Sequence, residues 1–529
     1  MRRAVSARQL RAFLADGAEI ALLDVREAGQ FGESHLLFAT PLPYSRLEID
    51  VAPLVPRRST RIVLCDDSGH DAAELAARRL EAMGYTNLSN LEGGIAGWAA
   101  AGYGLYKGVN VPSKLFGELI ELAYHTPRVT ARELVRMKEA GENFAIVDGR
   151  PFNEYRRMTI PGSTCCPNAE LPLRIATMVP DPRTKIIVNC AGRTRSIIGA
   201  QTLINFGIPN PVYALENGTQ GWHLSDLQLE RGSERRYPER VDAALLPAQQ
   251  AAARELMERF GVRLVSAETV GAWLTDPGRT TYLCDVRSPE EFKNDSVPGA
   301  VHAPGGQLVQ ATDQWVGVRN ARIVLIDSEG VRAPVVASWL KQLGCDAYVL
   351  EGGIRAAVRG ATPARPALPQ PEPISPSELM RATAAGKCTV FELRPSMDFR
   401  KGHIPASRWG IRPRLVAATR GATGTIVLVA DEPDIARLAA IDLLEAGFSD
   451  LKVLEGGLSA WTRAGYATEQ SPTVPPDAEC IDYLFFVHDR HAGNREAMKQ
   501  YLAWETGLID QLDEEERAAF KIGPVTSDG

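Results

Sequence analysis

The sequence predicts an α/β protein made of four tandem copies of one small domain, each a small parallel sheet flanked by helices, followed by a C-terminal helical tail. Three observations predict this class. Three short motifs recur four times in the same order. Apolar strand-like segments alternate with helical patterns, which is typical of a parallel sheet covered on both faces. Finally, 529 residues exceed what one hydrophobic core supports, while 45% hydrophobic residues suffice for several cores.

The first motif is a short apolar strand that ends in an acidic residue, any residue and an arginine. Because the strand is apolar on successive residues, it fits a buried parallel strand. We interpret each acid and arginine as a salt bridge within its domain, since the pair recurs in all copies. The four pairs are Asp24 and Arg26, Asp148 and Arg150, Asp285 and Arg287, and Glu392 and Arg394.

The second motif is another apolar strand with a polar residue at its start, and the third is an apolar residue followed by glutamate and a glycine-containing turn. Glycine there permits a positive φ or a close backbone approach, and a helix follows. A helical pattern with one apolar face lies between these two motifs. The second motif begins at Arg61, Lys185, Arg322 and Thr425, and the third at Leu91, Leu215, Leu350 and Leu454.

The spacing of the motifs aligns the four copies. From the acid of the first motif to the end of the second strand there are 42 positions in copies one to three (24 to 66, 148 to 190, 285 to 327) and 38 in copy four (392 to 430). One aligned position therefore holds Asp66, Cys190, Asp327 and Ala430. Only the second copy has a thiol there, so we expect the other three to be inactive and to serve as scaffold, channel walls or partner surfaces.

The domain boundaries follow from the segments between copies. Two connectors cover 105–127 and 234–262, the latter with helical character, and 361–374 is a proline-rich, stiff and extended linker. The tail contains an amphipathic helix, which we expect to pack on the last domain rather than to dock a partner. The expected domains are 1–104 (inactive), 128–233 (catalytic), 263–360 (inactive) and 375–468 (inactive), with the helical tail at 476–529.

Charge and cysteine usage limit the function classes. The net charge of -6 is spread along the chain without basic blocks, so no nucleic-acid partner is expected. No signal peptide or membrane-spanning run is visible, which indicates a cytoplasmic protein without a membrane partner. The eight cysteines are scattered, which favours reduced thiols over disulfides or a zinc site.

The predicted catalytic site is the loop after the second strand of copy two. Ligands of parallel sheets bind beyond the carboxyl ends of strands. Backbone N–H groups and the start of the following helix would stabilise a thiolate or a bound anion there without a metal. Two arginines add positive charge that would attract an anionic substrate. The loop consists of the nucleophile Cys190 and the substrate-binding residues Ala191, Gly192, Arg193, Thr194, Arg195 and Ser196.

These motifs resemble the rhodanese (thiosulfate sulfurtransferase) family: the acid-x-arginine step, the segments from Ile160 to Ser163 and from Val297 to Ala300, and the closing glycine turn with tryptophan. The resemblance covers roughly the first 468 residues. It implies that Cys190 takes the outer sulfur of thiosulfate, holds it as a persulfide and passes it to cyanide or a thiol, with the loop amides and Arg195 binding substrate. It implies no cofactor, and as partners a small anionic donor and a small or protein sulfur acceptor.

One departure from the family concerns the donor. The family often has glycine at the fourth loop position, whereas here Gly192 is third and Arg193 fourth. The two arginines favour thiosulfate over mercaptopyruvate, whose enzymes tend to have a less charged loop.

Two alternatives remain open. Cysteine phosphatases and arsenate reductases also use a loop from cysteine to arginine, but they place five residues between the two, whereas four separate Cys190 from Arg195. A persulfide carrier or redox sensor for a protein partner would use the same thiol without rapid turnover.

The remaining cysteines have ordinary interpretations. Cys65 precedes the aligned position by one residue, so strand alternation directs it to the opposite face and into the core. The Cys165 and Cys166 pair would resolve a persulfide if it lay near Cys190, but we interpret it as incidental. Cys480, His488 and His491 fall short of a metal site, and no metal is expected.

Overall fold

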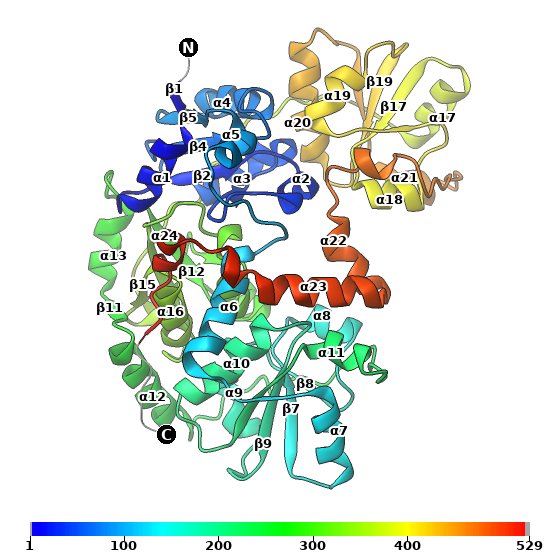
Figure 1. Cartoon of the computed structure of the whole chain (residues 1–529). Helices are drawn as coiled ribbons and strands as arrows, with labels where there is room; N and C mark the ends of the chain where they lie inside the picture. The colour runs from blue at the N-terminus through cyan, green and yellow to red at the C-terminus, as the bar shows by residue number, and fades with distance from the viewer. Residues whose placement is uncertain (1–2, 524–529) are drawn as a thin grey trace. The chain divides into compact units, whose positions relative to one another are not determined.

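The computed structural model describes residues 3–523, apart from the side chains of His491 and Ala492, and confirms the α/β class. It contains four five-stranded parallel sheets, one for each copy of the repeat (Figure 1). The strand order is the same in all four sheets, as in β1-β5-β4-β2-β3 of the first. The strand of the first motif therefore always lies beside the strand of the second, and their carboxyl ends meet at one edge.

The first and fourth domains contain these strands and helices: β1 Arg3–Val5, α1 Ala7–Ala15, β2 Ala21–Asp24, α2 Ala28–Glu33, β3 Thr40–Pro41, α3 Leu47–Leu54, β4 Ile62–Cys65, α4 Ala72–Ala82, β5 Leu88–Leu91 and α5 Gly94–Ala100; then β16 Glu372–Ile374, α17 Pro376–Ala384, β17 Cys388–Glu392, α18 Ser396–Lys401, β18 Arg408–Trp409, α19 Arg412–Ala418, β19 Thr425–Val429, α20 Pro433–Glu445, β20 Leu451–Leu454 and α21 Gly457–Arg463. Residues 357–371 carry neither helix nor strand, whereas residues 372–374, which we expected to belong to the linker, form β16 of the fourth domain's sheet.

The second and third domains are each preceded by a long connecting helix, α6 Val111–Tyr124 and α12 Leu246–Arg259. Their elements are β6 Arg128–Val129, α7 Ala131–Glu139, β7 Phe144–Asp148, α8 Phe152–Arg157, β8 Thr164–Cys165, α9 Leu171–Met178, β9 Lys185–Asn189, α10 Thr194–Asn205, β10 Val212–Leu215 and α11 Gly218–Leu224; then β11 Arg263–Val265, α13 Ala267–Leu274, β12 Thr281–Asp285, α14 Pro289–Asn294, β13 Val301–His302, α15 Gly305–Gln310, β14 Arg322–Ile326, α16 Arg332–Gln342 and β15 Asp346–Leu350.

The sheet of the second domain is buried on both faces, as its apolar strands predict. Along β9, Ile186 and Val188 belong to one buried cluster with residues of α9 and α10. Ile187, which points to the opposite face, belongs to a second cluster with residues of α7 and α11. The alternation places helices on both sides and leaves the end of the sheet, where β9 stops, as the place for a site.

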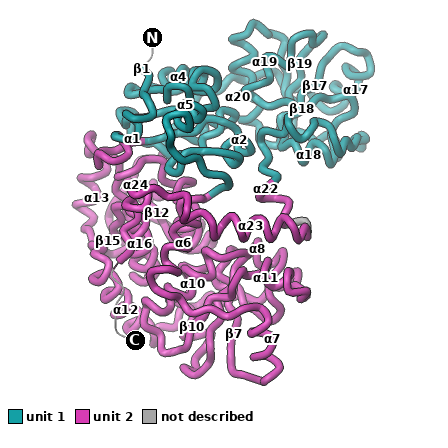
Figure 2. Tube along the Cα trace, in the orientation of Figure 1, with its two compact units in different colours: residues 1–12, 21–109, 363–485 teal, residues 13–20, 110–362, 486–529 magenta. Residues whose placement is uncertain are grey.

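The chain forms two compact units, each of which pairs two domains (Figure 2). Residues 1–12, 21–109 and 363–485 hold the first and fourth domains, and residues 13–20, 110–362 and 486–529 hold the second and third. In the latter unit, corresponding positions of the repeat meet. The indole N–H of Trp339 donates to Thr202 Oγ1 over 2.8 Å, and these two residues occupy the same place in their domains. The second and third domains are therefore related as a pseudo-twofold pair.

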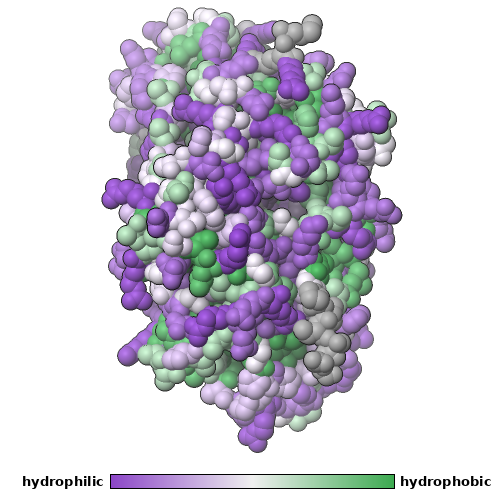
Figure 3. Space-filling view, turned by 90° about the vertical axis from the view of Figure 1, so that its left-hand side faces the viewer, coloured by the Kyte–Doolittle hydropathy of each residue, from purple (hydrophilic) through white to green (hydrophobic). Residues whose placement is uncertain are grey.

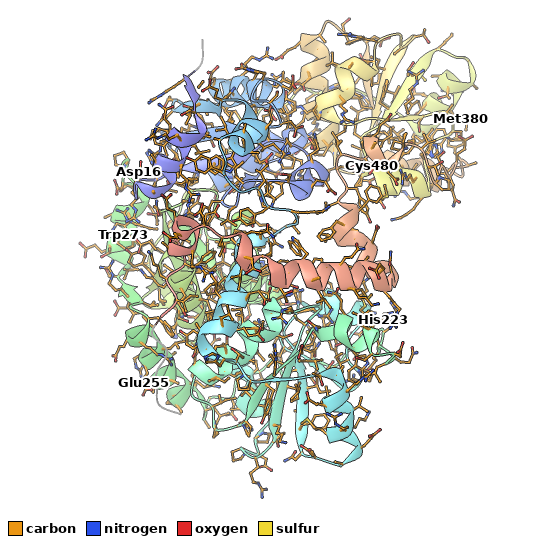
Figure 4. The ribbon with its side chains drawn as sticks, in the orientation of Figure 1. Asp16, His223, Glu255, Trp273, Met380 and Cys480 are labelled. Carbon is orange, nitrogen blue, oxygen red and sulfur yellow. The ribbon has the colours of Figure 1, made fainter. Side chains whose placement is uncertain are left out.

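The helical tail does not pack as expected. It consists of α22 Phe485–His488, α23 Arg495–Gly507 and α24 Glu514–Ala518. We expected its helix to pack on the last domain, and this was wrong: α23 lies against α6 and α11 of the second domain's unit (Figure 1). At its start, Arg495 donates to the carbonyl of His223, which is labelled in Figure 4, and pairs with Asp226 at 2.8 Å. The ion pair between Glu505 of α23 and Lys114 of α6 explains why the helix packs there.

Polar and apolar residues are mixed on the surface of the part that the structure describes (Figure 3). None of the helices there combines the length and the apolar composition that a bilayer crossing requires. Figure 3 shows hydrophilic and hydrophobic residues interspersed over one face. The large hydrophobic side chains that are exposed are scattered along the chain, for example Leu122, Leu264 and Val474, as is normal for single apolar residues on protein surfaces.

Candidate active site

Cys190 lies at the carboxyl end of β9, where the sequence placed it. The loop from Cys190 leads directly into α10, which begins at Thr194. The third motif holds this loop by a backbone hydrogen bond: the N–H of Thr219 donates to the carbonyl of Cys190 at 2.8 Å. Gly218 has a φ of +49°, and a Cβ there would stand 2.2 Å from the same carbonyl. Only glycine fits, which explains why the motif carries it.

The same close approach occurs in every copy of the repeat. A Cβ at Gly94, Gly353 or Gly457 would stand 2.4, 2.0 or 2.6 Å from the carbonyl of Asp66, Asp327 or Ala430, respectively. These carbonyls belong to the residues aligned with Cys190. The loop after the second strand is thus held in one place in all four domains, and what differs is the side chain that stands at its start.

The thiol of Cys190 is nearly buried, with 2% of the residue exposed. The hydroxyl of Ser196 donates a hydrogen bond to Sγ at 3.1 Å. Among the described residues, the backbone N–H groups of residues 191–195 have no hydrogen-bond acceptor. We call these five groups the amide cradle. Unpaired amides at the start of a helix form a binding site for negative charge.

In the first domain, the aligned aspartate fills the corresponding loop. The carboxylate of Asp66 accepts hydrogen bonds from the backbone N–H groups of Ser68 at 3.0 Å, Gly69, Asp71 at 3.1 Å and Ala73 at 2.9 Å. This carboxylate supplies the negative charge that the loop amides are arranged to bind.

The third domain repeats this arrangement. Asp327 accepts from the N–H groups of Gly330 and Val331 at 2.9 Å and of Ala333 at 3.0 Å. The repeated loop is therefore an anion-binding structure that the first and third domains occupy with their own side chain. In the second domain, the aligned residue is Cys190, which brings no carboxylate to these amides.

The loop arginines are both paired with carboxylates. Both terminal nitrogens of Arg195 donate to Glu154 on α8 at 2.8 Å, and Nη1 lies 3.4 Å from Oε1 of Gln307 on α15 of the third domain. Burial would raise the pKa of Glu154, but the Arg195 guanidinium outweighs it and the pKa is lowered. Glu154 is consequently ionised at neutral pH and offsets the charge of Arg195.

Arg193 points out of the loop toward α6. Its guanidinium donates to both oxygens of Glu118 at 2.7 Å and also to Glu121, and 7% of its side chain is exposed. We expected Arg193 to bring free positive charge to the site. Instead, two carboxylates balance it, and it ties the loop to a helix outside the second domain.

Gly192 and Thr194 are also in contact with segments outside their domain. The hydroxyl of Thr194 donates to Glu505 of α23 at 2.9 Å. A Cβ at Gly192 would stand 3.1 Å from Oε2 of Glu505 and 3.4 Å from Nε2 of Gln220. The order of glycine and arginine in this loop therefore fits its neighbours, because Gly192 leaves room for Glu505 and Arg193 reaches Glu118.

The acid and arginine pairs of the first motif are salt bridges, as predicted. Arg150 and Asp148 lie 2.7 Å apart and are almost completely buried, and the other three domains have the same pair. Asp148 also accepts from Asn189 Nδ2 at 3.0 Å. The pair therefore joins β7 to the end of β9 and supports the loop from within the sheet.

The other cysteines predicted to be structural are buried. Cys65 is fully buried and lies 3.6 Å from the carbonyl of Leu23. Burial raises the pKa of Cys165 to about 12 and raises that of Cys166 as well, so neither is poised as a thiolate at neutral pH. Cys166 belongs to the hydrophobic core of the second domain. The side chain of His491 lies outside the described part of the chain.

Comparisons with known proteins agree with the repeat. A family model described as "Rhodanese-like domain" matches residues 6–101, 130–225, 266–359 and 375–464. Among solved structures, the thiosulfate sulfurtransferase from Pseudomonas aeruginosa is 41% identical, with a TM-score of 0.92 over 99% of this chain and 100% of that one.

Two curated proteins share single domains with this chain. An HTH-type transcriptional regulator from Mycobacterium tuberculosis is 33% identical over 105 residues, and an uncharacterized protein from Synechocystis is 30% identical over 100 residues. These matches cover 20% and 19% of this chain and 45% and 54% of those proteins, so the chain spans about half the length of these relatives.

Proposed function

Because this chain belongs to the family of rhodanese-like domain proteins, we propose that it is a sulfurtransferase that carries sulfur as a persulfide on Cys190. The observation that supports this most directly is the amide cradle around Cys190, since the corresponding amides of the first and third domains bind the carboxylates of Asp66 and Asp327. A loop that binds an anion beside a thiol is suited to a nucleophile that attacks an anionic substrate and then carries negative charge itself.

Thiosulfate fits this site as donor. The thiolate of Cys190 attacks the outer sulfur of thiosulfate, and the bond between the two sulfur atoms of the donor breaks. Sulfite leaves with the electron pair, and the outer sulfur remains on Cys190 as a persulfide anion. The amide cradle and the Ser196 hydroxyl lie where this anion forms and would stabilise its charge. A cyanide ion or a thiolate then attacks the outer sulfur and restores the Cys190 thiolate.

The amide cradle and the similarity to a thiosulfate sulfurtransferase support thiosulfate as the donor, and the two arginines add little support. Arg193 and Arg195 each face carboxylates that offset their charge. The full-length similarity to a thiosulfate sulfurtransferase supports the same donor. The four residues between Cys190 and Arg195, with Arg195 held by Glu154, disfavour a phosphatase, whose arginine must grip a tetrahedral phosphate.

Intact-mass measurement after incubation with thiosulfate tests the proposal. The chain should gain about 32 Da, the mass of one sulfur atom, and lose it again on addition of cyanide. Cys190→Ser should gain nothing, whereas Cys388→Ser, which removes a partly exposed thiol elsewhere, should load like the wild type. Sulfur uptake by Cys190→Ser would refute the assignment of the nucleophile.

A persulfide carrier for a protein acceptor is the second candidate, and the burial of Cys190 favours it. With 2% of the residue exposed, a small acceptor has little access to Sγ, while a partner could open the site as it binds. Steady-state thiosulfate:cyanide turnover separates the two candidates. A rate of about one per second or faster identifies an ordinary enzyme, and loading without turnover identifies a carrier.

A further inference from the structure

Glu505 of the C-terminal helix α23 is buried against the catalytic loop. Only 1% of the residue is exposed. Its Oε1 accepts a hydrogen bond from Thr194 at 2.9 Å and lies 3.0 Å from Nζ of Lys114 on α6. The Lys114 ammonium in turn lies over the rings of Tyr501 and Trp504, 5.1 and 5.8 Å from their centroids. Two helices from outside the second domain thus meet at the residue that opens α10 (Figure 1).

The chemistry of this contact goes beyond what packing a tail helix requires. A buried ion pair contributes little net stability compared with apolar residues of the same size, because both charges lose their hydration. Oε2 of Glu505 is buried without a hydrogen-bond partner among the described residues and stands 3.1 Å from where a Cβ of Gly192 would lie. A leucine at position 505 would fill the space without this cost. What the carboxylate adds is a directed contact with the loop.

The need for such a contact follows from the comparison with the first and third domains. There, the aspartate carboxylate holds its loop from inside, through three or more amide hydrogen bonds. Cys190 receives one hydrogen bond, from Ser196. A loop whose amides must stay free for substrate cannot be tied from inside, so its shape has to be fixed from outside. Arg193 with Glu118, and Thr194 with Glu505, provide these outer ties.

We propose that Glu505 is a positioning residue of the active site, which holds Thr194 so that the amide cradle converges on Cys190. The C-terminal helix is on this proposal a component of the catalytic centre, although it lies outside all four domains of the repeat. The inference rests on the proposed persulfide chemistry, and it assigns the tail a function in forming the persulfide rather than in binding a partner. Thr194 transmits the effect, since its hydroxyl is the group that Glu505 holds.

The test is the single-turnover rate of persulfide formation at saturating thiosulfate in the full-length chain. Glu505→Ala should slow this step by about 10- to 100-fold, because small displacements of a catalytic group cost rate on that scale. Glu505→Gln, which keeps an acceptor for Thr194 but loses the attraction to Lys114, should fall in between. Lys499→Ala is the matched control, since Lys499 is exposed on the same helix, and it should react like the wild type.

Thr194 variants distinguish positioning from tail folding. Thr194→Val should slow persulfide formation as Glu505→Ala does, Thr194→Ser should restore it, and the double variant should be no slower than either single one. Wild-type rates in Thr194→Val and Glu505→Ala would overturn the proposal. A faster reaction in Glu505→Ala would also overturn it, because it would identify α23 as a lid. If the wild type takes up no sulfur, it is the proposed function that fails. Should Glu505→Ala not fold, the Thr194 pair still decides.

Discussion

Replacing Cys190 with aspartate should fill the amide cradle and make the second domain insensitive to anions. In the third domain, Asp327 accepts three amide hydrogen bonds of 2.9 to 3.0 Å. Hydrogen bonds to a charged group contribute about 1.5–3 kcal/mol each, which is offset in part by the cost of burying the carboxylate. We therefore expect Cys190→Asp to be inactive and about 1–3 kcal/mol more stable than Cys190→Ser.

Thermal unfolding with and without thiosulfate is the assay. In Cys190→Ser the cradle stays open, so thiosulfate at 100 times its Kd should add about 2.7 kcal/mol to the stability of the folded state. This corresponds to a rise in Tm of a few degrees. In Cys190→Asp the carboxylate already occupies the amides, and thiosulfate should leave Tm unchanged. Equal stabilisation of both variants would show that thiosulfate binds elsewhere, and the interpretation of the loop as an anion cradle would then be wrong.

Three further predictions concern stability and sulfur loading. Asp148→Asn leaves the buried Arg150 without its counter-charge and should cost about 3–5 kcal/mol in chemical unfolding. Burial would raise the pKa of Asp148, but Arg150 outweighs this effect and the pKa is lowered. The stability that the wild type gains from this pair is therefore present above about pH 4 and is lost on acidification. Asp148→Asn should lack this pH dependence. Replacing Cys165 and Cys166 by serine should leave the rate of sulfur loading unchanged in the mass assay; a loss of loading would give this pair a role. Burial raises the pKa of Glu27 to about 7, so its folded form binds a proton that the unfolded form has released, and stability should fall by about 3 kcal/mol between pH 4.5 and 7. Glu27→Gln should remove that fall in a pH series of unfolding measurements.

The fold could be predicted because its evidence is local and repeated. Each five-stranded sheet is marked in the sequence by two apolar strands, an acid and arginine step and a glycine turn, and all of these lie within one stretch of sequence. The position of Cys190 at the end of β9 follows from that pattern alone. The salt bridge of Arg150 was predictable too, since its partner stands two residues away.

The side chains that bind the loop residues were harder to predict, and they differ in how much sequence signal they had. The partner of Arg195 had a signal that could have been found: the sixth residue after the acid of the first motif is polar in every copy, namely Gln30, Glu154, Glu291 and Asp398. Glu118 and Glu505 had none. They lie 75 and 311 positions from the loop residues that they bind, on helices outside the repeat, and no periodicity connects them.

The retention of the third domain, which has Asp327 at the position of Cys190, has a physical reason in the same unit. Arg332 occupies the position of Arg195 in the repeat, and it is fully buried between Glu291 of its own domain and Glu170 of the second domain, both at 2.7 Å. In return, Gln307 of the third domain reaches Arg195. Each loop arginine is therefore set partly by the other domain. Losing the third domain would therefore take Gln307 away from Arg195 and the Arg332 guanidinium away from Glu170 of the second domain. The second domain can have Cys190 in place of the aspartate that holds this loop in the first and third domains, since Glu118 and Glu505 hold its loop from neighbouring segments.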